Sequence, residues 1–140
     1  MPRHVFRCPL RWSDMDSYGH VNNVQYLRLL EEARVAMLFI EPQADDVMSL
    51  DGQLVVVRHE IDYLAPLVYR PQPIDIETWT TRVGGASFTI AYEVRDGEQV
   101  YARARTVLAA IEKESGRARR LTPEERSWVQ KWVEPEPADP

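Results

Sequence analysis

Cysteine is almost absent from this chain, because Cys8 is the single cysteine among 140 residues. An internal disulfide is therefore excluded, and the composition suits a reducing compartment. No His and Asn pattern surrounds Cys8, so we expect a small apolar strand residue rather than a catalytic thiol. The N-terminus lacks the apolar core of a signal peptide, and no apolar run is long enough to cross a bilayer. We expect a cytoplasmic protein.

Positive charge is also scarce, since the chain has 17 Lys and Arg residues against 22 Asp and Glu residues, and its formal net charge is −5. Nothing global therefore indicates a nucleic acid or an anionic membrane as partner. The three histidines show no spacing typical of metal ligands, and we expect neither a metal nor another cofactor. An anionic ligand would have to be bound by local basic side chains such as Arg58, Arg82, Arg103 and Arg105.

The balance of residue types is that of a globular protein, with 28% charged and 44% hydrophobic residues. A chain of this length can form one domain whose core needs neither metal nor disulfide. No internal repeat is visible. The stretch 134–140 is rich in Pro, Glu and Asp and cannot build a core. We expect one domain over residues 1–133 and a disordered tail over residues 134–140.

Glycine and proline are missing from residues 23–40, where apolar residues recur at helical spacing. The pattern predicts a helix of about 18 residues, roughly 27 Å long. Asn22 is a suitable N-cap, Gln25 would complete a capping box, and Pro42 would end the helix. Because apolar residues occupy most of its circumference, we expect this helix to be buried on most sides.

Patterns typical of strands cover most of the remaining chain. They predict strands over residues 4–12, 54–63, 74–83, 87–95 and 100–112, and a capped C-terminal helix over residues 123–132. Pro9 indicates that the first strand lies at an edge or contains a bulge. A helix buried on most sides needs a strongly curved sheet around it, so we predict an α+β domain with an antiparallel meander. Its edges lack obvious protection, which favours pairing between subunits.

Reactive polar side chains gather immediately before the predicted long helix. A helix N-terminus offers unpaired N–H groups and a partial positive charge. A carboxylate held there can attack a polarised carbonyl or direct water at it. Asp16 is the candidate for this role, and a loop residue that caps its own turn is the alternative. We expect Asp14 to be a local turn acceptor.

Three more residues of this cluster have candidate roles. His20 could orient the substrate, hydrogen-bond its carbonyl or tune Asp16, and a structural role in tying the loop to the helix is an equal alternative. Asn23 could contact substrate or water, whereas Asn22 is better explained as the helix cap. Gly19 can adopt backbone shapes closed to other residues, which would let an acyl group approach the chain closely.

The stretch from Asp14 to Leu27, DMDSYGHVNNVQYL, together with the EEAR of Glu31–Arg34, resembles the hot-dog-fold acyl-CoA thioesterases of the 4-hydroxybenzoyl-CoA thioesterase type. The segment DYLAP at 62–66 is similar to that family's second strand and exit turn, and the order of elements agrees over residues 3–121. The resemblance implies a hot-dog fold, in which a curved antiparallel sheet wraps around a long central helix. It also implies that subunits join their sheets edge to edge, with active sites at the subunit interface.

In this family an acidic residue in the loop before the helix acts as base or nucleophile, and amides at the helix N-terminus polarise the thioester carbonyl. Asp16 matches the carboxylate by position, because it is the second Asp of Asp-x-Asp and lies three residues before Gly19. The matching amide is that of Asn23 or a neighbour. With His20 from the analysis of the loop, the candidate catalytic residues are Asp16, His20 and Asn23.

Four residues are candidates for binding the substrate: Gly19, His59, Arg82 and Ser87. Relatives commonly place contacts to the CoA nucleotide in the turn that here runs from Arg82 to Ser87, and a basic side chain there suits a phosphate. An ordinary hairpin is the equal alternative for this turn. For His59 the alternative is a core or interface histidine whose hydrogen bonds are satisfied within the protein.

Glu31, Glu32 and Arg34 are charged residues on the predicted buried helix, so some of them need partners. We expect an ion pair inside the subunit or across the subunit interface. The alternative is that Glu31 or Glu32 faces the active site of the neighbouring subunit.

Taken with the resemblance, the sequence predicts an acyl-CoA thioesterase that hydrolyses an acyl-CoA thioester to a carboxylic acid and CoA. The partners expected are the acyl-CoA substrate and further copies of the chain, in a homodimer or homotetramer. One alternative is a non-catalytic module that binds acyl-CoA or an acyl carrier, since fold does not fix function. The other is a hydratase or dehydratase of the same fold.

Overall fold

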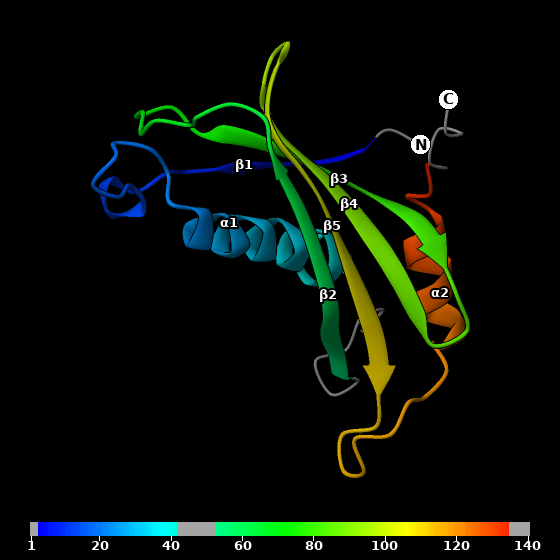
Figure 1. Cartoon of the computed structure of the whole chain (residues 1–140). Coiled ribbons are helices and arrows are strands. Elements are labelled where there is room, and N and C mark those ends of the chain that lie inside the picture. Colours follow the sequence, from blue (N-terminus) through cyan, green and yellow to red (C-terminus); the bar gives the residue numbers. More distant parts are fainter. Residues whose placement is uncertain (1–2, 42–52, 135–140) are drawn as a thin grey trace.

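A computed structural model describes residues 3–41 and 53–134 of the chain. Within these residues five strands form one antiparallel sheet in the order β1-β3-β4-β5-β2. The sheet curves over one side of the long helix α1, Asn23–Val35 (Figure 1). The predicted α+β architecture is therefore confirmed. The strands are β1 (His4–Cys8), β2 (Gln53–Tyr63), β3 (Ile74–Val83), β4 (Ser87–Asp96) and β5 (Gln99–Ile111).

The long helix has the predicted extent, because α1 continues as a π-helical turn over Ala36–Ile40. Its Leu29, Leu30 and Met37 are fully buried and belong to the same hydrophobic cluster as residues of β3, β4 and β5. The expectation of burial on most sides is wrong for the single chain, since Val24 remains 64% exposed. The sheet covers only one face of the helix, which leaves the opposite face to solvent in the single chain.

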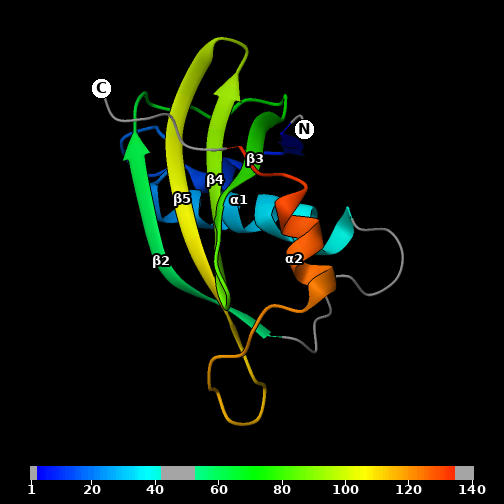
Figure 2. The ribbon, with the colours of Figure 1, turned by 90° about the vertical axis from the view of Figure 1, so that its right-hand side faces the viewer.

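Strand β2 pairs with β5, so the predicted meander holds only for β3, β4 and β5. Ten residues, 64–73, follow β2 and carry the chain past two strands before β3 begins. In Figure 2 β2 lies at one edge of the sheet, beside β5. The other edge is β1, which pairs with β3. The prediction that Pro9 marks an edge strand is confirmed, but the strand ends at Cys8 rather than at residue 12, because proline has no N–H to donate.

The remaining strand boundaries lie within one residue of their predictions. The C-terminal helix α2, Pro123–Gln130, begins with the predicted capping box, in which Thr122 and Glu125 bond each other's backbone N–H at 3.0 and 2.8 Å. Trp128 of α2 donates through Nε1 to the carbonyl of Met37 at 3.0 Å. Helix α2 therefore packs against the C-terminal end of the long helix.

The face of the sheet that points away from α1 is polar. Glu93 on β4 accepts from Arg3 at 2.8 Å and from Arg103 on β5 at 2.9 Å. Arg3 also forms an ion pair with Glu134 at 2.7 Å, so that residue of the predicted tail is tied to the N-terminal segment. The rest of the tail, 135–140, and Pro42, the predicted end of the long helix, lie outside the described residues.

Cys8 is fully buried at the end of β1, as expected for an apolar strand residue. Burial, reinforced by the negative charge of Glu32, raises the pKa of its thiol to about 11. A thiol with so high a pKa is protonated at neutral pH and is a poor nucleophile.

Candidate active site

The loop before α1 closes on itself between Met15 and Val21, which form an isolated antiparallel bridge. The backbone N–H of Asp16 donates to the carbonyl of His20, and that of Gly19 donates to the carbonyl of Asp16, both at 3.0 Å. Gly19 has a φ of +81°, which other residues rarely adopt. The predicted need for glycine at this position is therefore confirmed, and the turn holds Asp16 and His20 close to the start of α1.

Asp14 is a structural carboxylate, as expected, and its contacts reach further than its own turn. It is fully buried and accepts from the backbone N–H of Arg11 at 2.8 Å. Arg28 on α1 donates to both of its oxygens at 2.9 and 2.8 Å. Burial alone would raise the pKa of Asp14, but the N–H of Arg11 and the two guanidinium groups outweigh it and lower that pKa. Asp14 thus fixes the loop to the helix.

Asp16 is half-buried, and each of its carboxylate oxygens accepts one hydrogen bond. The backbone N–H of Tyr18 donates to Oδ1 at 2.9 Å, and Nδ2 of Asn22 donates to Oδ2 at 3.0 Å. Asn22 also caps α1 as predicted, because its Oδ1 accepts from the N–H of Val24 at 2.8 Å. The contact between Asn22 and Asp16 is not visible in the sequence pattern, which only indicated a cap.

The predicted capping box at the start of α1 does not form. The N–H of Asn22 that Gln25 would bond is already used, since it donates to the carbonyl of Asp14 at 2.9 Å. The side chain of Gln25 instead accepts from Arg11 at 3.3 Å and from Arg28 at 3.4 Å. Helix α1 therefore begins on a side-chain cap from Asn22 alone.

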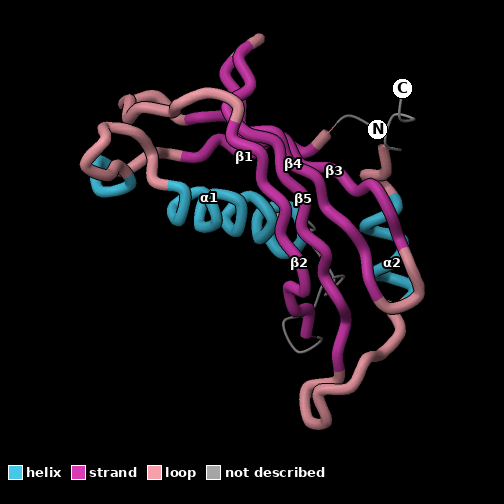
Figure 3. Tube along the Cα trace, in the orientation of Figure 1, coloured by secondary structure: helices cyan, strands magenta, loops and turns pink. Residues whose placement is uncertain are grey.

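A cleft of about 540 Å³ lies where this loop meets the segment that follows β2. The two loops lie at the end of the molecule where α1 begins (Figure 3) and are joined by a hydrogen bond of 2.7 Å from the N–H of Val21 to the carbonyl of Leu67. Asp16, His20 and Asn23, the three predicted catalytic residues, all line this cleft. All of its other lining residues are aromatic or apolar: Tyr18, Val21, Tyr26, Tyr63, Leu64, Ala65, Pro66 and Leu67.

Two tyrosines of the cleft were not anticipated as site residues. The rings of Tyr26 on α1 and Tyr63 at the end of β2 meet edge to face, with centroids 5.2 Å apart. Burial raises the pKa of Tyr26 to about 12, and it also raises that of Tyr63. Both therefore stay neutral at physiological pH and offer apolar ring surface. Their separation of 37 residues in the sequence hides this pairing from local patterns.

Asn23, the first residue of α1, lines the cleft, and its two backbone polar groups differ in their contacts. Within the described part of the chain, no hydrogen bond uses the backbone N–H of Asn23. This N–H belongs to the positive end of the helix and can donate to a bound carbonyl oxygen. The carbonyl of Asn23 accepts from the hydroxyl of Tyr63 at 3.4 Å, which links α1 to the end of β2.

His59 on β2 does not line this cleft. Its Nδ1 lies 2.9 Å from Oγ1 of Thr106, which in turn accepts from the hydroxyl of Tyr92 at 2.9 Å. Tyr92 also accepts from Arg34 of α1 at 3.3 Å. Burial and the positive charge of Arg34 lower the pKa of His59. This chain of contacts favours the alternative for His59, a histidine satisfied within the protein.

The charged residues of α1 pair inside the subunit. Arg34 is buried and lies 3.6 Å from Glu31, while Glu32 lies 3.8 Å from Arg28. The expected internal ion pairs are thus present in the single chain. No group of three His, Cys, Asp or Glu side chains among the described residues could hold a metal ion.

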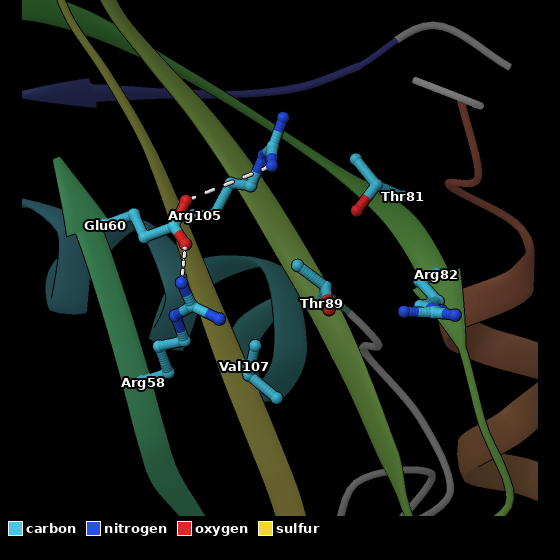
Figure 4. Close-up of a pocket in the computed structure, with 7 residues that line it drawn as sticks. All are labelled: Arg58, Glu60, Thr81, Arg82, Thr89, Arg105 and Val107. Atoms are coloured by element: carbon cyan, nitrogen blue, oxygen red, sulfur yellow. Dashed lines mark ion pairs between the residues drawn. The ribbon is translucent and has the colours of Figure 1, made fainter. Parts of the chain in front are cut away.

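Arg82 and Ser87 lie apart from the Asp16 cleft. Arg82 borders a second hollow of about 370 Å³, on the face of the sheet opposite α1. Figure 4 shows Arg58 and Arg105 around the same hollow, with Glu60 between them and ion-paired to both. Ser87 begins β4, and its carbonyl accepts from the N–H of Gly84 at 2.7 Å, as in an ordinary hairpin. The structure therefore does not bring all the predicted substrate-binding residues together within one chain.

Residues 10–133 match the sequence profile of the Thioesterase-like superfamily. The chain belongs to this superfamily. A 1,4-dihydroxy-2-naphthoyl-CoA hydrolase from Synechococcus elongatus is 28% identical over 135 residues, which cover 93% of this chain and 97% of that relative. The solved structure of the PA5185 protein from Pseudomonas aeruginosa superposes with a TM-score of 0.82 at 28% identity. The aligned residues cover 94% of this chain and 92% of the PA5185 chain.

A second solved structure with a similar fold is that of a thioesterase from Thermus thermophilus complexed with coenzyme A and Zn. Its TM-score is 0.74 at 26% identity, with 91% of this chain and 92% of that chain covered. The hot-dog fold implied by the motif is thus confirmed for this thioesterase-like protein. None of its described helices is long and apolar enough to cross a membrane.

Proposed function

We propose that the protein is an acyl-CoA thioesterase, with Asp16 as its catalytic base or nucleophile. One observation carries the proposal: the Asp16 carboxylate lines an apolar cleft beside the first N–H groups of α1. An apolar cleft with few polar groups suits an acyl chain or ring whose carbonyl is held at one end. A relative named as a CoA-thioester hydrolase and a structural neighbour complexed with coenzyme A support the same class of substrate.

In the hydrolytic mechanism, the thioester carbonyl oxygen accepts a hydrogen bond from the N–H of Asn23, where the helix N-terminus favours negative charge. Asp16 removes a proton from water as the water oxygen bonds to the carbonyl carbon. The tetrahedral intermediate then breaks its C–S bond, and the CoA thiolate leaves and takes up a proton. If Asp16 instead attacks the carbon, breakage of the C–S bond releases the CoA thiolate and leaves a mixed anhydride of Asp16 and the acyl group, which water hydrolyses to the carboxylic acid and free Asp16. His20, on the same cleft, orients the substrate.

The proposal includes a second copy of the chain as partner. Strand β2 is an edge strand 11 residues long, and its Val56 and Val57 are 40% and 57% exposed. A long edge with exposed apolar side chains can pair with the same edge of another subunit. Such pairing would place a neighbour beside Tyr63, at one wall of the cleft. The molecular mass in solution tests this: a monomer at micromolar concentration would contradict it.

Arg82 is proposed to bind a phosphate of CoA. With Arg58 and Arg105 it surrounds the hollow on the outer face of the sheet, where Glu60 offsets only part of the positive charge. Guanidinium groups bind phosphates through paired N–H donors. Since this hollow and the Asp16 cleft lie on opposite faces of one sheet, a nucleotide bound by Arg82 would belong to a substrate in the site of another subunit.

The test is thiol release from a panel of aromatic and aliphatic acyl-CoAs. We expect turnover by the wild type, and a loss of about 100-fold or more in kcat for Asp16→Asn with the fold and oligomeric state intact. Asp75→Asn is the matched control, because Asp75 lies on β3 in an exposed pair with Arg7, and it should keep full activity. Full activity of Asp16→Asn would refute the assignment. Tight acyl-CoA binding without thiol release would indicate a binding module, and an absorbance change on enoyl-CoA without thiol release would indicate a hydratase.

A further inference from the structure

We infer that Asn22 is a positioning residue that holds the Asp16 carboxylate in its reactive orientation, in addition to capping α1. The inference rests on the proposed function, because it concerns how Asp16 is presented to the substrate. It departs from the sequence pattern, in which Asn22 is only a cap. Two hydrogen bonds carry it: Nδ2 of Asn22 to Asp16 at 3.0 Å, and the N–H of Val24 to Oδ1 of Asn22 at 2.8 Å.

These two contacts fix the amide of Asn22 in one orientation. A flipped amide would turn its NH₂ group toward the N–H of Val24 and its oxygen toward the carboxylate, so that both contacts would become repulsive. Because Val24 belongs to α1, the hydrogen-bond donor offered to Asp16 is anchored on a rigid helix rather than on the loop. Asn22 therefore fixes the position of the Asp16 carboxylate relative to the helix.

The carboxylate would otherwise be held by the loop alone. Its second contact is the backbone N–H of Tyr18, and both Tyr18 and His20 are exposed, Tyr18 by 84%. One donor on each oxygen sets the plane of the carboxylate and leaves further lone pairs for water or substrate. Small displacements of a catalytic group are costly, and about 1 Å can reduce the rate roughly 100-fold.

Few side chains can perform both roles at this position. Asp and Ser cap helices about as well as Asn does. An Asp would present a carboxylate to the Asp16 carboxylate in place of a donor. A Ser hydroxyl can accept from the N–H of Val24 as the cap, but its O–H is one bond closer to the backbone than Nδ2 of Asn and does not reach the Asp16 carboxylate from there. Asn combines an acceptor for the helix with a separate donor for Asp16, and this separation allows the two roles to be tested independently.

The experiment compares Asn22→Ser, Asn22→Ala and Asn22→Asp with the wild type in thermal unfolding and in thiol release from one good acyl-CoA substrate. Ser keeps the cap and Ala removes it, so of these two variants only Asn22→Ala should lower the thermal midpoint. Both lose the donor that reaches Asp16, so both should lose about 10- to 100-fold in kcat with KM little changed. In Asn22→Asp two facing carboxylates share a proton, which should move the acid limb of the pH–rate profile to higher pH by about one unit.

Equal kcat losses in Asn22→Ser and Asn22→Ala, despite different stabilities, support positioning. A wild-type kcat in Asn22→Ser, or a wild-type acid limb in Asn22→Asp, would overturn the inference and leave Asn22 as a cap alone. The proposed function is judged separately, by the wild type and Asp16→Asn. If the wild type releases no thiol from any acyl-CoA, both the proposed function and this inference are refuted.

Discussion

Replacing Arg28 with Met tests whether the buried carboxylate of Asp14 holds the active-site loop on α1. Arg28 donates to both oxygens of Asp14, and the Asp14 side chain is completely inaccessible to solvent. Met preserves much of the aliphatic length of Arg28 but removes its charge and both hydrogen bonds. Asp14 then keeps only Arg11, whose side chain is itself 54% exposed. A buried carboxylate would be left with half of its charged partners.

The expected cost follows from the burial of Asp14. Breaking a buried ion pair by removing one partner costs about 3–5 kcal/mol, and a hydrogen bond to a charged group contributes about 1.5–3 kcal/mol. Arg28 is 25% exposed and Arg11 remains, so we expect a loss of about 2–4 kcal/mol in the free energy of unfolding at neutral pH. This is a large part of the roughly 5–15 kcal/mol that stabilises a typical domain.

The loss should depend on pH. In the folded protein the N–H of Arg11 and the guanidinium of Arg28 hold the pKa of Asp14 below its usual value, against the opposing effect of burial. A lowered folded-state pKa contributes stability that is present above the unfolded-state pKa of about 4 and is lost as the pH falls through the folded-state value. Arg28→Met removes part of this contribution. The difference in the free energy of unfolding between the variant and the wild type should therefore become smaller below about pH 4.

The assay is urea unfolding of both proteins between pH 7 and pH 3. Arg7→Met is the matched control, because Arg7 is 80% exposed and lies 3.9 Å from Asp75; it should change stability by less than about 0.5 kcal/mol. If Arg28→Met cost no more than Arg7→Met, or cost the same at every pH, the account of Asp14 as a buried ionised anchor would be refuted.

Three further predictions concern two hydroxyls in the core and the hollow at Arg82. The Thr78 hydroxyl is buried without a hydrogen-bond partner among the described residues, so Thr78→Val should raise the free energy of unfolding by about 1 kcal/mol. Thr106→Val should lower the free energy of unfolding by about 1–2 kcal/mol, because the Thr106 hydroxyl bonds Tyr92 and His59. Urea unfolding measures both variants, and a change of the same sign in Thr78→Val and Thr106→Val would contradict these two predictions. Arg82→Ala should raise KM several-fold for CoA thioesters but not for short pantetheine thioesters, and an equal effect on both would rule out a phosphate contact.

Local patterns were sufficient for most element positions. Period-2 alternation located β3 with its observed limits, and the absence of glycine and proline from residues 23–40 gave the extent of the long helix. These predictions succeed because a strand that buries one face repeats its apolar residues every 2 positions and a helix does so every 3.6 positions. The loop cluster was found in the same way, since Asp16, His20 and Asn23 are near neighbours in the sequence and need only a tight turn at Gly19 to share a cleft.

Long-range pairings could not be predicted in this way. The alternation of β2 is the same whether it pairs with β3 or β5, because periodicity describes one strand and not its neighbour. For the same reason the sequence did not show that Tyr63 would close the cleft over Tyr26, or that Arg82 would face away from Asp16.

The sequence by itself determined which residue types stand before the helix, where the helix begins and which carboxylate matches a thioesterase. Only the tertiary structure decided what each polar group bonds. Gln25 had the right spacing for a capping box, but the N–H of Asn22 already donates to Asp14. The amide of Asn22 could therefore be assigned to Asp16 only once the loop had closed. Each hydrogen bond excludes others, and this competition is settled by positions in space rather than by order along the chain.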